Sequence, residues 1–124
     1  MRDDILAAKD LHREPISVPA WGVSGLYVRE MTAAERDEYE SFLIERRGPD
    51  EKLNIRNVRA KLVVMTLTDA DGNRIFTDDD LDAVSAKGAK SIEAIVEKAM
   101  ELNALRQKDV EALAKNSEAA QGAG

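Results

Sequence analysis

Acidic side chains are concentrated between residues 69 and 80, and their spacing resembles that of a calcium-binding loop. Counted from Asp69, such a loop needs Gly at its sixth position for a sharp turn and a bidentate Glu at its twelfth. Arg74 and Asp80 occupy these two positions, and the apolar residue Ile75 falls one place early. The sequence therefore disfavours a calcium-binding loop. A metal-dependent enzyme that uses these carboxylates is an open alternative.

The same segment fits a tight hairpin followed by a capped helix. Asp71-Gly72 is a strong signal for a type I′ turn, in which both central residues have positive φ. Thr77 is the predicted N-cap of the next helix, and Asp80 falls at its third helical position. We therefore interpret the segment as a structural hairpin and predict no metal site.

The other reactive residue types do not form a catalytic arrangement. His12 is the only histidine and no cysteine is present, so neither a zinc cluster nor a thiolate site is available. A Ser-His-Asp triad would depend on His12, which lies in a polar linker beside Arg13 and is expected to be exposed. With 4% aromatic residues and no phosphate-binding glycine loop, the sequence predicts a non-enzymatic protein without catalytic residues or cofactors.

Charge also limits the class of partner. The net charge is −6, and the acidity lies mainly in residues 63–124, which carry 7 basic and 12 acidic side chains. One basic stretch, which we interpret as a solvated helix face and loop, contains Arg46, Arg47, Lys52, Arg56, Arg59 and Lys61. We expect no nucleic-acid partner, although a small regulatory or antitoxin-like module that uses this stretch is an alternative.

No targeting signal is expected from the sequence. No apolar run approaches the roughly 20 residues that cross a bilayer, so no membrane partner is expected. The first ten residues mix acids with apolar residues and do not form a secretory signal. The lack of cysteine is compatible with a reducing compartment, and we expect a cytoplasmic location.

The 124 residues predict one α+β domain, mostly α-helical with a small antiparallel β-sheet. Helical patterns cover residues 3–10, 32–46, 54–67, 78–87 and 91–103, with a last short helix at 108–115. A sheet is expected from residues 14–30, joined by the hairpin at 66–76. The domain is expected to span residues 1–116, and residues 117–124 are expected to form a disordered tail.

Several local signals fix the expected helices. Thr32 and Glu35 form a capping box, and the nearly all-round apolar character of residues 54–67 predicts the central helix of the core. Gly88 is the expected left-handed C′ residue of the helix at 78–87, and Ser91 is the expected cap of the next helix. Asn103 is expected to make a hydrogen bond near a helix end.

Six segments, taken in order, resemble the tail assembly chaperones of long-tailed, non-contractile bacteriophages and prophages. They share strand, turn and cap chemistry in the same order and spacing: Asp4–Ala8, Val18–Gly22, Tyr27–Arg36, Thr68–Thr77, Glu101–Asn103 and Leu113–Asn116. The resemblance covers about residues 4–117.

This resemblance implies a non-enzymatic protein of the bacterial host cytoplasm that is absent from the mature virion. It implies that the tape measure protein and the tail tube protein are partners. No short motif of the family marks the partner surface, so no binding residues are assigned. Trp21 and Tyr27 could belong to an apolar patch that shields a helical partner, or could pack in the core or against the sheet.

The family resemblance also implies that a longer product is often made by a −1 ribosomal frameshift near the end of the short reading frame. A slip of this kind needs a heptamer of the form X-XXY-YYZ. Ala114-Lys115-Asn116 can be encoded as GCA-AAA-AAC, which contains A-AAA-AAC in the required phase. The sequence therefore places a possible slip about eight codons before the end of this chain.

Overall fold

The computed structural model describes residues 1–45 and 57–105. Within these ranges lie the helices α1 (Arg2–Ala7), α2 (Ala33–Glu45), α3 (Val58–Thr66), α4 (Leu81–Ser85) and α5 (Ala89–Leu102). The strands are β1 (Arg13–Ile16), β2 (Leu26–Arg29) and β3 (Leu67–Thr68), and single 3-10 turns form η1 (Pro19–Trp21) and η2 (Asp78–Asp80). The predicted α+β class, mostly helical with a small antiparallel sheet, is confirmed.

The sheet has the order β1-β2-β3, and both pairs are antiparallel. In β2, Leu26 and Val28 are buried against the helices, whereas Tyr27 and Arg29 are half-buried on the opposite face. This alternation follows from the two-residue period of a strand. The prediction that residues 14–30 supply two strands and that the hairpin at 66–76 joins them is confirmed, because Thr68 pairs with Tyr27 and bridges to Arg74.

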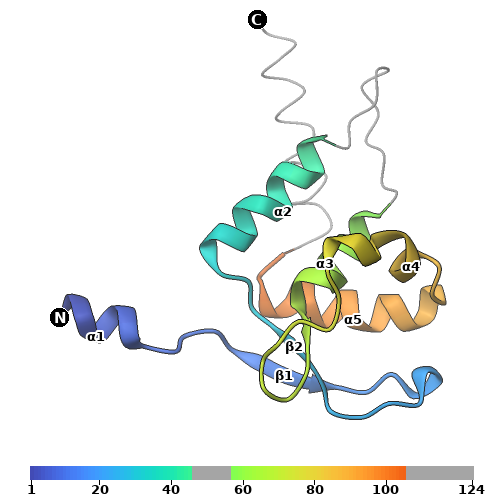
Figure 1. The fold of residues 1–124 in the computed structure, drawn as a ribbon, viewed down its shortest axis with the longest axis horizontal. Coiled ribbons are helices and arrows are strands. Elements are labelled where there is room, and N and C mark those ends of the chain that lie inside the picture. Colours follow the sequence, from blue (N-terminus) through green and yellow to red (C-terminus); the bar gives the residue numbers. More distant parts are fainter. Residues whose placement is uncertain (46–56, 106–124) are drawn as a thin grey trace, which may run out of the picture.

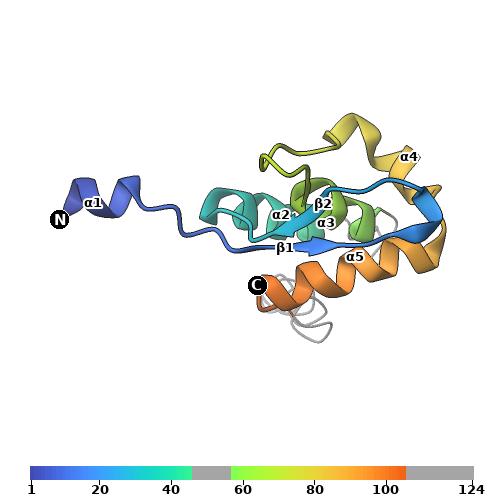
Figure 2. The ribbon, with the colours of Figure 1, turned by 90° about the horizontal axis from the view of Figure 1, so that it is seen from below.

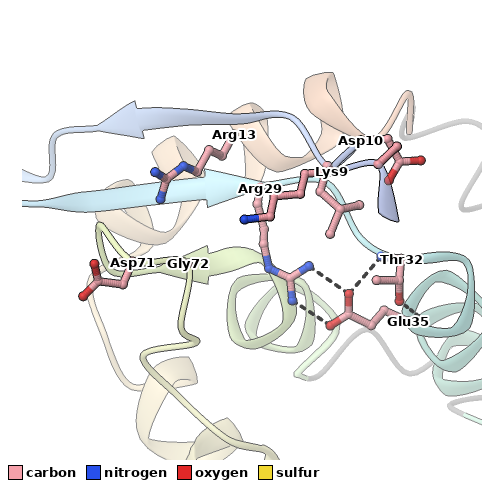
Figure 3. A pocket seen from close by; sticks show the side chains of 10 residues that line it. Lys9, Asp10, Arg13, Arg29, Thr32, Glu35, Asp71 and Gly72 are labelled. Atoms are coloured by element: carbon pink, nitrogen blue, oxygen red, sulfur yellow. Dashed lines mark hydrogen bonds and ion pairs between the residues drawn. The ribbon is translucent and has the colours of Figure 1, made fainter. Parts of the chain in front are cut away.

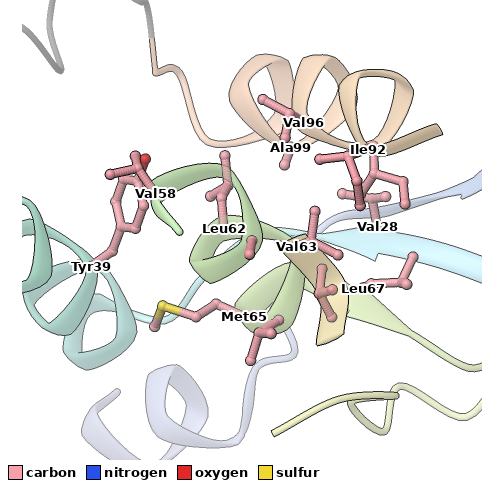
Figure 4. Packing of buried hydrophobic residues seen from close by; sticks show 14 of the residues in the cluster. Val28, Tyr39, Val58, Leu62, Val63, Met65, Leu67, Ile92, Val96 and Ala99 are labelled. Atoms are coloured by element: carbon pink, nitrogen blue, oxygen red, sulfur yellow. The ribbon is translucent and has the colours of Figure 1, made fainter. Parts of the chain in front are cut away.

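Helix α3 is the centre of the core, as predicted. It packs against α2, α4 and α5, and α5 also contacts β1 and β2 (Figure 4). Every residue of α3 except Arg59 is buried. A helix that is apolar nearly all round has no face suited to water and therefore lies inside the fold. Its partners on the neighbouring elements include Val28, Tyr39, Leu43, Ile92, Ile95, Val96 and Ala99.

Helix α3 is shorter than the predicted span of 54–67. Residues 54–56 lie outside the described part, and Asn57 has a left-handed φ of 67°, so the helix begins at Val58. At the other end, Leu67 has extended backbone and pairs with Val28. Pairing with β2 thus ends the helix one residue early, a tertiary effect that the apolar periodicity does not contain.

The predicted type I′ turn at Asp71-Gly72 is wrong. Gly72 is the only one of the two with a positive φ, at 89°. The backbone N–H of Asp69 donates to the Asn73 carbonyl at 2.9 Å and leaves a three-residue loop between them. The Asp69 carboxylate accepts the N–H groups of Asp71 at 2.9 Å and Asn73 at 3.0 Å, and this local bonding favours a loop closed by one left-handed glycine.

The predicted C′ residue of the helix at 78–87 and the predicted N-cap of the following helix are also wrong. Gly88 has φ −57° and ψ 134°, so it is not a left-handed C′ residue. It is the N-cap of α5, which begins at Ala89, and Ser91 lies inside the helix and does not cap it. The N–H of Lys87 donates to the Val84 carbonyl at 3.0 Å, and this bond closes α4 without a left-handed residue. The Thr77 cap is confirmed, since its N–H donates to Asp80 Oδ2 at 2.8 Å.

The N-terminal arm, residues 1–11, extends away from the rest of the protein. In Figures 1 and 2, α1 lies beyond one end of the sheet, opposite to the end that carries η1. The predicted short helix at 3–10 is present as α1, and none of its residues is buried. The predicted helix at 108–115 and the predicted tail at 117–124 lie outside the described residues.

Candidate functional site

An almost entirely apolar hollow lies where the loop before β2 meets the segment after the hairpin. It is lined by Trp21, Val23, Leu26, Leu67, Ile75, Phe76 and Lys87, and its volume is about 250 Å³. We call these seven residues the apolar hollow. Leu67 is fully buried, whereas Val23 is 56% exposed and Ile75 is 42% exposed. The hollow is therefore open to solvent and lined by side chains that would gain by being covered.

The loop that carries Trp21 and Val23 is shaped by two glycines. Gly22 ends η1 with a φ of 65°, and Gly25 has a φ of 77°, both in the left-handed region that favours glycine. Val18 is buried just before the loop and Leu26 just after it. Anchored at both ends, the loop holds Trp21 half-buried against the core, where it also lines the apolar hollow.

Tyr27, the other aromatic candidate, is not part of the apolar hollow. It lies on the sheet face that carries Arg29, and its ring is half-buried. The Arg13 guanidinium lies 4.8 Å from the ring centroid, and Arg13 also donates to the Ala70 carbonyl. Tyr27 therefore packs against the sheet, whereas Trp21 joins the core to an open surface.

A charged cluster, Arg29, Glu35 and Arg74, connects β2, α2 and the hairpin. Arg29 binds both Glu35 carboxylate oxygens at 2.9 and 2.8 Å (Figure 3). Arg74 donates to Glu35 Oε2 at 2.6 Å. Glu35 also accepts the N–H of Thr32 at 2.9 Å, so the predicted capping box is confirmed. Glu35 therefore both starts α2 and fixes that helix to β2 and to the hairpin.

The hydrogen bonds to Glu35 control its protonation. Burial alone would raise the pKa of this carboxyl, but the bonds from Arg29, Thr32 and Arg74 outweigh burial and lower the pKa to about 2. The carboxylate is thus ionised throughout the physiological range. A group so firmly held as an anion serves as an anchor and not as a general acid or base.

A larger polar cleft of about 880 Å³ lies between the N-terminal arm and the charged cluster (Figure 3). Its lining includes three cationic side chains, Lys9, Arg13 and Arg29, and three acidic ones, Asp10, Glu35 and Asp71. The opposite charges balance, and ligand sites are usually more apolar than this. We therefore do not assign the cleft as a ligand-binding site.

Lys61 departs from the expectation for the basic stretch. Its side chain is only 5% exposed, and Nζ lies 2.9 Å from Asp78 Oδ1 and 3.3 Å from Glu38 Oε2. The prediction of a solvated face is wrong for Lys61. The signal was available, because Lys61 shares its helix face with the apolar residues Val58, Val64 and Met65. Arg59 is 65% exposed, while Arg46, Arg47, Lys52 and Arg56 lie outside the described residues.

The remaining candidate residues have structural roles. The His12 side chain is 60% exposed, as predicted, and its Nε2 lies 3.5 Å from Glu14 Oε1. Asn103 makes the expected hydrogen bond near a helix end, from its Nδ2 to the Ala99 carbonyl at 2.8 Å. It also accepts the N–H of Met31 at 2.7 Å, a long-range bond that sequence reasoning missed.

Residues 1–45 and 57–105 contain neither a metal-binding cluster nor a membrane-spanning helix. No group of three or more His, Cys, Asp or Glu side chains in these ranges converges where a metal ion could bind. Within the same ranges, no helix has both the length and the apolarity needed to cross a bilayer. The Asp69–Asp80 segment is occupied by its own backbone and cap contacts, which supports the hairpin interpretation.

Comparisons with known proteins agree with the family resemblance. A family model described as "Phage tail assembly chaperone" matches residues 1–120. The fold is similar to a solved structure of the bacteriophage HK97 tail assembly chaperone, with a TM-score of 0.57 over 82% of this chain and 91% of that chain. Sequence identity is 17%, so this likeness concerns the fold alone. No curated protein sequence matches the chain.

Proposed function

Because this chain belongs to the phage tail assembly chaperone family, whose members are non-enzymatic, we propose that it binds the tape measure protein during tail assembly. In this role it also helps to bring tail tube subunits to the tape measure protein. It acts in the cytoplasm of the bacterial host and does not remain in the mature virion. The family match spans residues 1–120 and so includes every element described above.

The apolar hollow is the observation that carries this proposal. A long helical tape measure exposes apolar faces until the tube closes around it, and such faces aggregate unless they are covered. The apolar hollow offers uncovered apolar surface, because Val23 and Ile75 are 56% and 42% exposed. The net charge of −6 helps to keep a complex of this kind in solution.

Co-expression tests the proposed function. The tape measure protein is produced in bacteria alone, with this chain, or with an unrelated acidic protein of similar size. We expect the tape measure protein to become soluble only with this chain and to copurify with it. A tape measure protein that stays insoluble and does not copurify with this chain contradicts the proposal.

A frameshift-extended form is the second part of the proposal. In such a form, ribosomes that slip at Ala114-Lys115-Asn116 replace the last residues with a further domain that contacts the tail tube protein. The slip site lies outside the described residues, and the support is the codon pattern together with family membership.

The gene sequence and mass spectrometry test the slip separately from the chaperone role. Any Lys115 codon other than AAA removes the heptamer. If the heptamer is present, expression of the intact locus should give a minor, longer product that shares residues 1–114 with this chain. The absence of that product rules out the extended form but leaves the short chaperone role standing.

A further inference from the structure

We propose that the apolar hollow is the contact site for one amphipathic helix of the tape measure protein, an inference that rests on the function proposed above. An apolar side chain of that helix enters between Trp21 and Ile75. A carboxylate within one turn of it pairs with Lys87. The contact is thus a helix that lays its apolar face into a preformed groove.

The dimensions of the apolar hollow suit this occupant. Its volume is about 250 Å³, and a cavity of about 150 Å³ already holds a benzene molecule. One large apolar side chain, or two smaller ones on the same helix face, therefore fits. A small-molecule ligand is disfavoured because such sites usually range from about 300 to 1,000 Å³ and contain several polar groups.

The apolar hollow is preformed because its inner wall belongs to the core. Leu67 is fully buried, and Leu26 is 8% exposed. Both lie in paired strands, β3 and β2. Only the outer rim, with Val23, Ile75 and Lys87, is substantially exposed, so binding does not require the core to reorganise. Preformed walls reduce the entropy lost on binding.

Lys87 sets the charge of the partner. It is the single charged residue that lines the apolar hollow, and it forms no ion pair within the described part of the chain. Its backbone N–H is bonded to Val84, which fixes the position from which the side chain extends. A carboxylate of the partner can form an ion pair with Lys87, whereas a cation of the partner at the same place is repelled.

Helix α1, which exposes two large apolar side chains, does not fill the apolar hollow. Helix α1 carries Ile5 and Leu6, which are 64% and 67% exposed, but it lies beyond the end of the sheet opposite to η1 (Figure 1). Helix α1 therefore leaves the apolar hollow open. Among the described residues, the N-terminal arm provides a matched exposed apolar surface that can be altered as a control.

Trp21 provides a direct readout of binding, because it is the only tryptophan in the chain. Overlapping tryptophan-free peptides that cover the tape measure protein are titrated into the full-length chain. We expect one peptide with an amphipathic pattern and a nearby acidic residue to shift the Trp21 emission to shorter wavelength. The same peptide should bind Val23→Asp at least tenfold more weakly, because a carboxylate replaces an apolar contact at the rim.

Two controls separate the apolar hollow from general effects of charge. Ile5→Asp introduces the same charge at an exposed apolar residue outside the apolar hollow and should leave the affinity within about twofold. Lys87→Glu should weaken binding, while Lys90→Glu, at an exposed position that does not line the apolar hollow, should not. A peptide whose acidic residue is replaced by Lys should bind Lys87→Glu better than it binds the original chain.

The outcomes distinguish the two proposals. Unchanged melting temperatures for the variants establish that they are folded. If the original chain, Val23→Asp and Lys87→Glu all bind the full-length tape measure protein equally well, the apolar hollow is not the contact site, although the proposed function stands. If the original chain binds no part of the tape measure protein, the proposed function itself fails. If a peptide of residues 1–10 shifts the Trp21 emission and no tape measure peptide does, the apolar hollow belongs to a second copy of this chain and the inference is overturned.

Discussion

The side chain of Asn103 accepts the backbone N–H of Met31 at 2.7 Å, although 72 residues separate the two in sequence. The same amide donates to the Ala99 carbonyl at 2.8 Å, so it closes the end of α5. Met31 lies between β2 and α2, and its N–H has no strand partner there. One buried amide thereby joins the end of the last described helix to the exit of the central strand.

Replacement of Asn103 by Ala should lower the free energy of unfolding by about 1–3 kcal/mol, since it leaves the buried N–H of Met31 without an acceptor. Hydrogen exchange at Met31 should become faster. Asn73→Ala is the matched control, because Asn73 is exposed and only its backbone forms hydrogen bonds within the described residues, and it should cost less than about 0.5 kcal/mol. Equal costs for the two variants would contradict a structural role for the Asn103 amide.

Replacement of Leu62 by Ala should lower the free energy of unfolding by about 2–5 kcal/mol, the usual range for a buried leucine. Leu62 is 2% exposed in α3, at the centre of the core. Urea unfolding followed by far-UV circular dichroism measures the change. Leu6→Ala is the control, because Leu6 is 67% exposed on the N-terminal arm and should be nearly neutral. A cost below about 0.5 kcal/mol for Leu62→Ala would refute the assignment of α3 as the central helix.

Replacement of Gly72 by Ala should cost about 1–2 kcal/mol, because its φ of 89° lies where side chains with a Cβ are strained. A Cβ added at Gly72 or at Gly88 would meet no atom within 4 Å, so crowding does not contribute at either site. Gly88→Ala, at a φ of −57°, should therefore cost less than about 0.5 kcal/mol. Thermal melts of the two variants provide the comparison, and a larger loss for Gly88→Ala would show that the sign of φ does not decide the effect.

Replacement of Glu35 by Gln should remove a pH-dependent part of the stability. The pKa of Glu35 is lowered to about 2 in the folded protein, below its ordinary value of 4.5. The contribution is therefore fully present above about pH 4.5 and is lost as the pH falls towards 2. From the shift it amounts to roughly 2–4 kcal/mol.

Unfolding free energies of the original chain and of Glu35→Gln, measured in urea at a series of pH values, check this prediction. The difference between the two proteins should be largest near neutral pH and should shrink as the pH falls from about 4.5 to about 2. Asp79→Asn is a suitable control, since the Asp79 side chain forms no ion pair or hydrogen bond among the described residues. A difference that does not change with pH would show that the Arg29 and Arg74 contacts do not hold Glu35 as an anion.

The sequence by itself determined the features that depend on neighbouring residues. The capping box of Thr32 and Glu35 and the Thr77 cap each involve residues three positions apart, and both are confirmed. The buried central helix followed from the density of apolar residues in α3. Family membership was also visible in the order of short segments. These signals are strong because local backbone geometry places the residues together whatever the rest of the chain does.

Only the tertiary structure decided which distant residues meet. The capping role of Glu35 follows from its spacing from Thr32. The contact between Glu35 and Arg74, however, depends on the pairing of β3 with β2. The early end of α3 at Thr66 has the same origin, since Leu67 leaves the helix to pair with Val28. The apolar hollow combines residues 21–26 with residues 67–87, and no local pattern specifies that meeting. Such contacts arise when the whole chain buries its apolar surface at once, so their partners are set by packing and not by sequence spacing.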